Sequence, residues 1–139
     1  MKLQEAIKIF YDENIDKNYI KNKNIAVLGY GSQGRAQALN LKDSGANVKV
    51  ALRENSKSRS LADNDGIQWD NIDETIRWAD VLVMLAPDES HKEIYENHIK
   101  GNLKTGAYLI FAHGFSINYR QIVPREDLNV LMVSPKGAG

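Results

Sequence analysis

The sequence predicts an α/β fold in which a doubly wound, mainly parallel sheet carries helices on both faces. From residue 24 onward, short runs rich in β-forming residues alternate with segments of helical character, at the spacing typical of βαβ units. Most of these runs are apolar along their length, as expected of strands that are covered on both faces. A glycine-rich turn also follows the first run and opens the first helix.

Residues that end strands or begin helices separate the runs. Gly45 is expected to cap the C-terminus of the first helix of the sheet. Pro87 ends the fourth run, and Asp88 is expected to cap the N-terminus of the helix that follows. The expected strands are residues 24–29, 47–52, 67–69, 81–85, 108–112 and 130–134. The expected helices are residues 32–44, 58–64, 72–79, 90–99 and 118–122.

Length and composition indicate one globular domain. The 139 residues suffice for one hydrophobic core but are few for a two-domain enzyme. The hydrophobic fraction of 42% and the charged fraction of 26% are ordinary for a soluble protein. Without an internal repeat or a flexible linker, residues 1–139 are interpreted as a single domain, in which residues 1–23 form a polar lead-in.

Charge and cysteine content exclude several classes of partner. The 18 Lys and Arg residues balance 18 Asp and Glu residues, so no global field attracts nucleic acid or an anionic membrane. The absence of Cys excludes disulfides and thiolate metal sites. The first residues carry charge throughout and lack an apolar run long enough for a signal peptide or a membrane span. We therefore expect a cytoplasmic protein.

The glycine-rich turn has the spacing of a dinucleotide-binding fingerprint. Gly29, Gly31 and Gly34 form a G-x-G-x-x-G that follows a predicted strand and opens a predicted helix. In that pattern the glycines allow a tight turn, close approach of a pyrophosphate and close packing of helix on strand. The N-terminus of the helix then offers free N–H groups to phosphates. The alternative is a tight strand-to-helix turn that binds no ligand.

The end of the second strand bears on the choice between NAD and NADP. Arg53 is followed by two serines and two further basic residues, a suitable nest for a 2′-phosphate: Ser56, Lys57, Ser58 and Arg59. This pattern favours NADP. Glu54 favours the opposite choice, because an acidic residue here could bind the ribose hydroxyls of NAD. A solvated basic loop, with Ser58 as a helix N-cap, is the structural alternative.

Two later strand ends carry candidate functional residues. His113 is the histidine at a strand's carboxyl end, and Lys136 follows the last strand, where it could offer a cation to an anionic substrate. A single histidine is nonetheless more often structural than catalytic. His91 and His98 lie seven residues apart without a zinc-binding pattern, so no metal site is expected.

Five motifs, GYGSQG, LRENSKS, PDE, FAHGF and PKGAG, resemble in their order and spacing the N-terminal NADPH-binding domain of ketol-acid reductoisomerase. The resemblance runs from about Tyr11 to the last residue. Enzymes of this family convert an acetohydroxy acid into a dihydroxy acid in valine and isoleucine biosynthesis. They use magnesium for an alkyl migration and NADPH for the reduction that follows.

The resemblance implies a role for each matching position. His113 and Lys136 would be catalytic. The implied cofactor-binding residues are Gly29, Tyr30, Gly31, Ser32 and Gln33 at the pyrophosphate, Arg53, Ser56 and Ser58 at the 2′-phosphate, Asp88, Glu89, Ser90 and His91 beside the adenosine, and Gly139 near the nicotinamide. The sequence departs from the family at Arg35 and Gln37, where histidines are common, and at Asn55 and His91, where glycine and glutamine are frequent.

The resemblance also implies what this chain does not supply. In the family the Mg²⁺ ligands belong to a helical C-terminal domain, which this sequence does not contain. We therefore expect the chain to bind NADP(H) and to meet an acetohydroxy acid substrate only together with that domain. The surface that would face it could promote a homo-oligomer.

Two alternatives remain open at this point. One is a non-catalytic NAD(P)-binding module or sensor, against which the presence of His113 and Lys136 argues mildly. The other is the cofactor domain of a different two-domain dehydrogenase that acts on hydroxy acids. The FAHGF and SPKGAG segments argue against the second alternative.

Overall fold

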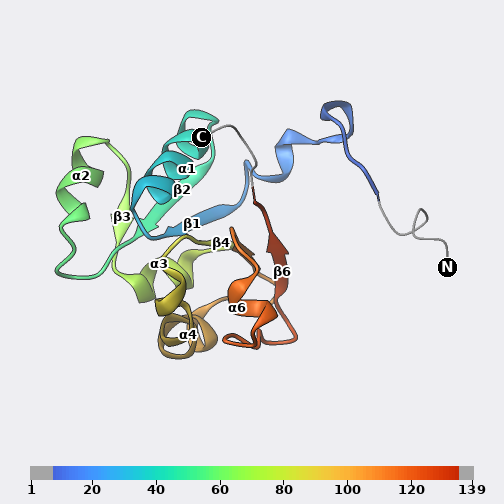
Figure 1. Ribbon diagram of the computed structural model, residues 1–139. Coiled ribbons are helices and arrows are strands. Elements are labelled where there is room, and N and C mark those ends of the chain that lie inside the picture. Colours follow the sequence, from blue (N-terminus) through green and yellow to red (C-terminus); the bar gives the residue numbers. More distant parts are fainter. Residues whose placement is uncertain (1–7, 135–139) are drawn as a thin grey trace.

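The computed structural model describes residues 8–134, and its framework is a six-stranded parallel sheet (Figure 1). The strands are β1 (Asn24–Leu28), β2 (Asn47–Ala51), β3 (Trp69–Asp70), β4 (Val81–Met84), β5 (Tyr108–Phe111) and β6 (Asn129–Met132). Their order is β3-β2-β1-β4-β5-β6, and every neighbouring pair is parallel. This order confirms the doubly wound fold and places its switch point between β1 and β4.

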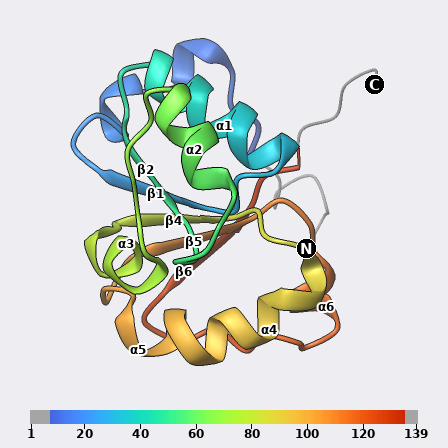
Figure 2. The same cartoon turned by 90° about the vertical axis from the view of Figure 1, so that its left-hand side faces the viewer.

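Helices cover both faces of the sheet (Figure 2). On one face lie α1 (Ser32–Asp43) and α2 (Ser58–Asn64), and Gly45 with φ +80° follows α1 as expected. On the other face lie α3 (Ile72–Trp78), α4 (His91–Ile94), α5 (Lys100–Asn102) and α6 (Phe115–Asn118). A π-helical stretch, Tyr95–Ile99, joins α4 to α5. Short 3₁₀ turns occur at Asp12–Asn14, Lys17–Tyr19 and Asp88–Ser90.

A separate hydrophobic core lies against each face of the sheet. Along β1, Ile25 and Val27 pack in the core beneath α1 and α2. Ala26 and Leu28 point to the opposite face, into the core that includes Ile76 of α3 and the helix that follows β4. Because alternate residues face opposite cores, both sets must be apolar. This is the reason that β1 is apolar along almost its whole length.

The last predicted helix lies earlier in the chain than expected. The prediction for residues 118–122 was wrong, since α6 spans Phe115–Asn118. The His113 ring accepts a hydrogen bond at Nδ1 from the Phe115 N–H, at 3.1 Å, which supports the start of the helix. Arg120, with φ 52°, then turns the chain out of helical geometry. The sequence pattern did not predict that the His113 ring would accept this hydrogen bond.

Two smaller expectations were also wrong. The third strand is Trp69–Asp70 and not 67–69, because the Ile67 N–H donates to the Ala62 carbonyl at the end of α2, at 3.0 Å. Asp88 is not a helix N-cap: it begins a 3₁₀ turn, and Ser90 is the residue that precedes α4.

The segment before the sheet lies outside both cores. Residues 8–22 are exposed, including the large apolar side chains of Ile9, Phe10, Tyr11, Ile15, Tyr19 and Ile20. Figure 1 shows this segment extending away from the sheet. Within residues 8–134 no helix has the length and apolar character needed to cross a membrane.

Candidate nucleotide-binding site

A cleft of about 550 Å³ opens at the switch point of the sheet. Its walls are the segments that follow β1, β2 and β4, together with Ile72 of α3 and Ile94 of α4. The carboxyl ends of parallel strands meet at one edge of a sheet, so three sequence-distant segments converge here. Of the residues predicted to bind cofactor, the cleft is lined by Gly29, Tyr30, Gly31, Arg53, Ser56, Ser58, Glu89 and Ser90.

Two glycines at the turn after β1 are required by the packing of the protein itself. Gly29 has φ +106°, and a Cβ there would lie 2.8 Å from the backbone of Leu85. At Gly34 a Cβ would lie 2.1 Å from the Gly29 carbonyl oxygen. The first glycine therefore permits the turn, and Gly34 lets α1 pack against the end of β1.

Gly31 is different, because nothing in the protein requires it to be glycine. Its φ of −77° is accessible to any residue, and a Cβ there would meet no atom within 4 Å. That Cβ would project into open space at a turn that lines the cleft. A site that keeps such a position free of a side chain fits a ligand whose phosphates approach the backbone closely.

The N-terminus of α1 directly follows this turn, although Ser32 and Gln33 lie outside the cleft lining. Ser32 and Gln33 are exposed in its first turn, and the first N–H groups of a helix have no acceptor within the helix. A twelve-residue helix places a partial positive charge at this end. The arrangement suits the anionic pyrophosphate of a dinucleotide.

Tyr30 also packs in the core under α1 and α2. Its hydroxyl donates to Asp65 Oδ2 at 2.7 Å, and the Arg35 guanidinium binds both oxygens of the same carboxylate at 2.7 Å. Lys42 adds bonds to the Asp65 and Gly66 carbonyls, at 3.2 Å and 2.7 Å. The glycine-rich turn is thus tied to the end of α2. The sequence did not predict a contact between Asp65 and Tyr30, because the two residues lie 35 positions apart.

The ionisation of this cluster makes stability depend on pH. Hydrogen bonds from Arg35 and Tyr30 lower the pKa of Asp65 to about 2, from 3.8. Burial, followed by the hydrogen bond to Asp65, raises the pKa of Tyr30 to about 12, from 10.0. The lowered carboxyl pKa stabilises the fold above about pH 4, and this contribution is lost as pH falls toward 2. The raised phenol pKa stabilises the fold below pH 10, and this contribution is lost as pH rises toward 12.

We expect Asp65→Asn to lower the free energy of unfolding at pH 7, with a deficit that shrinks between about pH 4 and pH 2. The deficit shrinks because the wild-type carboxylate is itself protonated there. Urea unfolding of both proteins at several pH values measures this difference. Tyr30→Phe is the companion variant, and it should remove the loss of stability between pH 10 and 12. A deficit for Asp65→Asn that stays constant down to pH 2 would contradict the assignment.

The loop after β2 forms the second wall. Arg53, Ser56 and Ser58 line the cleft, and a turn closes the loop, because the Ser56 N–H donates to the Arg53 carbonyl at 3.0 Å. The Ser56 hydroxyl oxygen accepts the Ser58 N–H at 3.2 Å, which leaves its own proton to donate elsewhere. Lys57, not Ser58, is the N-cap of α2.

Arg59 does not line the cleft with Arg53. Its guanidinium lies over the Trp69 ring, 4.4 Å from the centroid, and it lines a neighbouring cavity. The structure thus places Arg59 outside the cleft lining, which includes Ser56 and Ser58 of the expected phosphate nest. The stacking partner comes from β3, which sequence spacing did not place beside α2.

The loop after β4 forms the third wall and includes Glu89 and Ser90. His91, by contrast, is only 3% exposed and lies outside the cleft lining. Its Nε2 donates to the Ala86 carbonyl at 2.7 Å, and its Nδ1 lies 2.8 Å from the Ser116 hydroxyl. Both ring nitrogens are occupied, so His91 joins this loop to α6. Asp88 is exposed and also lies outside the lining.

His113 is exposed at the carboxyl end of β5. Because Nδ1 accepts the Phe115 N–H, the proton of the neutral ring resides on Nε2, which is directed away from this bond. A cavity of about 320 Å³ lies here, between His113 and the side chains of β6. Lys136 and Gly139, predicted to act near this end of the sheet, lie outside the described residues.

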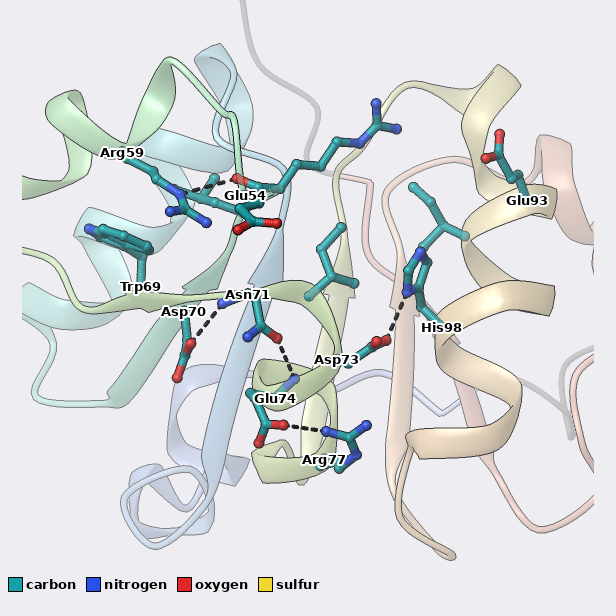
Figure 3. Close-up of a pocket in the computed structure, with 14 residues that line it drawn as sticks. Glu54, Arg59, Trp69, Asp70, Asn71, Asp73, Glu74, Arg77, Glu93 and His98 are labelled. Atoms are coloured by element: carbon teal, nitrogen blue, oxygen red, sulfur yellow. Dashed lines mark hydrogen bonds and ion pairs between the residues drawn. The ribbon is translucent and has the colours of Figure 1, made fainter.

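A larger cavity of about 770 Å³ adjoins the cleft and shares Leu52, Arg53, Ile72 and Ile94 with it. Figure 3 shows charged side chains of both signs around it, with Arg59 and Trp69 on one side and His98 on the other. His98 Nδ1 lies 2.7 Å from Asp73 Oδ1. Across residues 8–134, however, no three His, Asp or Glu side chains gather as metal ligands.

Comparison with known proteins gives the family. The profile of the NADPH-binding domain of acetohydroxy acid isomeroreductase, another name for ketol-acid reductoisomerase, matches residues 19–139. The chain belongs to the ketol-acid reductoisomerase family. A solved structure of an NADH-preferring ketol-acid reductoisomerase from an uncultured archean is 45% identical, with a TM-score of 0.86. The match covers 94% of this chain and 41% of that one.

More distant structures share the fold alone. A putative oxidoreductase from Jannaschia sp. CCS1 is 22% identical, with a TM-score of 0.71 over 79% of this chain and 40% of that one. A 3-hydroxyisobutyrate dehydrogenase from Mycobacterium tuberculosis is 18% identical, with a TM-score of 0.66 over 83% of this chain and 41% of that one. The chain thus corresponds to the nucleotide-binding domain of an oxidoreductase family. Neither the non-catalytic NAD(P)-binding module nor the cofactor domain of a different dehydrogenase is favoured.

Proposed function

We propose that this chain is the cofactor domain of a cytoplasmic ketol-acid reductoisomerase and binds NADPH in the cleft between β1, β2 and β4. The observation that supports a bound dinucleotide is Gly31, a glycine that the protein's own packing does not require and that faces the cleft. The pyrophosphate would lie against this turn and the N-terminus of α1. The adenosine would extend toward the loops after β2 and β4.

The preference for NADPH is supported by the loop after β2. A guanidinium at Arg53 can bind a 2′-phosphate through two parallel hydrogen bonds, and the serine hydroxyls at 56 and 58 can donate to the same group. NADH is the second candidate. It is favoured by Glu54, which lies in the adjoining cavity beside Arg53, and by the NADH preference of the archean relative.

The proposed reaction is that of the family. Bound NADPH would supply the hydride that reduces the rearranged substrate. His113 would face the substrate with its Nε2–H as a donor, and Lys136 would place a cation near the anionic substrate. The family's two Mg²⁺ ions would polarise the acetohydroxy acid, bound by acidic residues outside this chain. Valine and isoleucine biosynthesis is the proposed pathway.

A calorimetric titration of the chain with NADPH and then with NADH, without magnesium or substrate, tests the proposal. Saturable binding with tighter affinity for NADPH is the expected result. Tighter binding of NADH would keep the cofactor-domain assignment and replace the cofactor. Failure of the folded chain to bind either nucleotide would overturn the proposal.

The 2′-phosphate assignment predicts a selective effect of Arg53→Gln. We expect the variant to lose about tenfold in affinity for NADPH and little for NADH, since only NADPH carries the group that Arg53 would bind. Lys57→Gln is the matched control, because Lys57 belongs to the same loop but lies outside the cleft lining. Equal losses for both nucleotides in Arg53→Gln would remove Arg53 from the 2′-phosphate site.

A further inference from the structure

Arg59 makes two contacts that connect the loop after β2 to the edge of the sheet. Its guanidinium stacks on Trp69 of β3, and its Nε donates to the Arg53 backbone carbonyl at 3.1 Å (Figure 3). Trp69 is itself held by a 2.7 Å hydrogen bond from its Nε1 to Asp63 Oδ1 of α2. The ring that supports Arg59 is therefore fixed at both its strand and its indole nitrogen.

The bonded carbonyl belongs to the residue that the proposed function places at the 2′-phosphate. Arg53 is exposed, and its carbonyl accepts both the Ser56 N–H and the Arg59 Nε–H. The carbonyl orientation of a residue is set by the same backbone that aims its side chain. A contact that holds this carbonyl consequently also fixes the start of the Arg53 side chain and the turn that carries Ser56.

The position of Arg59 argues against direct binding of the cofactor. It lines the neighbouring cavity and is outside the cleft lining to which Arg53, Ser56 and Ser58 contribute. Its guanidinium lies over an aromatic ring, a use of Arg that Lys reproduces poorly. Arg59 therefore contributes to this site mainly by holding the backbone of the loop in position, and less by its positive charge.

We propose that Arg59, held by Trp69, is a positioning residue that sets cofactor selectivity by ordering the loop that carries Arg53, Ser56 and Ser58. This inference rests on the proposed nucleotide-binding function and extends it. Ordering the loop in advance lowers the entropy lost when the 2′-phosphate binds. NADH makes no use of the ordered phosphate ligands, so its affinity should depend much less on Arg59.

The test separates charge from position with Arg59→Lys, which keeps the positive charge but loses the planar stack and the Nε–H donor. We expect this variant to bind NADPH about tenfold more weakly than wild type while binding NADH almost unchanged. Arg59→Met should behave in the same way, because it removes the same contacts. Trp69→Phe keeps an aromatic face for the guanidinium and should retain most of the selectivity.

Calorimetric titration of each variant with both nucleotides measures the ratio of affinities, and thermal unfolding shows whether each is folded. Equal weakening of both nucleotides with a lowered Tm would mean that Arg59 only stabilises the fold, and would overturn the inference. Arg59→Lys that binds NADPH as wild type does would also overturn it, with the proposed function intact. If wild type itself binds neither nucleotide, the proposed function fails first and this inference fails with it.

Discussion

Gly34→Ala is expected to lower the free energy of unfolding by about 3 kcal/mol or more. The added methyl would lie 2.1 Å from the Gly29 carbonyl oxygen and 2.8 Å from its carbon, closer than any real contact. Both obstructing atoms are backbone, so relief requires α1 to move away from the end of β1. The gain of about 1 kcal/mol from Ala in place of Gly in a helix is too small to compensate.

Urea unfolding followed by circular dichroism measures the effect. Gly101→Ala is the matched control, because Gly101 lies in α5 and a Cβ there meets nothing within 4 Å. That variant should be as stable as wild type or slightly more stable. Comparable stability of Gly34→Ala and wild type would show that the helix does not pack against the turn as described.

Gly31→Ala is expected to have the opposite pattern, with stability retained and cofactor binding lost. Its backbone conformation suits alanine and its Cβ meets no protein atom, so the free energy of unfolding should change by less than about 1 kcal/mol. The same methyl would occupy the space proposed for the pyrophosphate. We expect the affinity for NADPH and NADH alike to fall by at least about tenfold, since both carry this group.

Two measurements on Gly31→Ala test this prediction together. Titration with both nucleotides gives the affinity, and an unfolding curve shows that the loss does not come from misfolding. Unchanged affinity in the folded variant would mean that the pyrophosphate lies elsewhere, and it would remove the principal support for the proposed function. A loss of affinity for NADPH alone would mean that the added methyl disturbs the 2′-phosphate, which only NADPH carries, and not the pyrophosphate.

Local chemistry made much of the fold predictable. Apolar runs between helical segments identified all six strands, and the glycine spacing identified the switch-point turn. The predicted ends of helices and strands were wrong where a contact outside the periodic pattern of apolar residues determined them. His113 starts α6 early through its ring nitrogen, and Ile67 closes the end of α2 in place of joining β3.

The sequence predicted which segments form the candidate site, because the order of the strands determines where their ends meet. Residues at the ends of parallel strands meet at one edge, so the segments containing Gly31, Arg53 and Glu89 could be expected to converge. Individual side chains within those segments could not be placed in the same way. His91 fell in the right segment yet is buried between Ala86 and Ser116, with both ring nitrogens bound.

By itself the sequence determined the family, the doubly wound sheet and the turn that opens onto the cleft, because each depends on short motifs and on periodic apolar residues. Only the tertiary structure decided which polar side chains face the cleft. Asp65 with Tyr30 and Arg35, and Trp69 with Arg59, are pairings between separate elements. Such contacts depend on how α2 and β3 pack beside α1 and β2, and residue spacing along the chain carries no record of that packing.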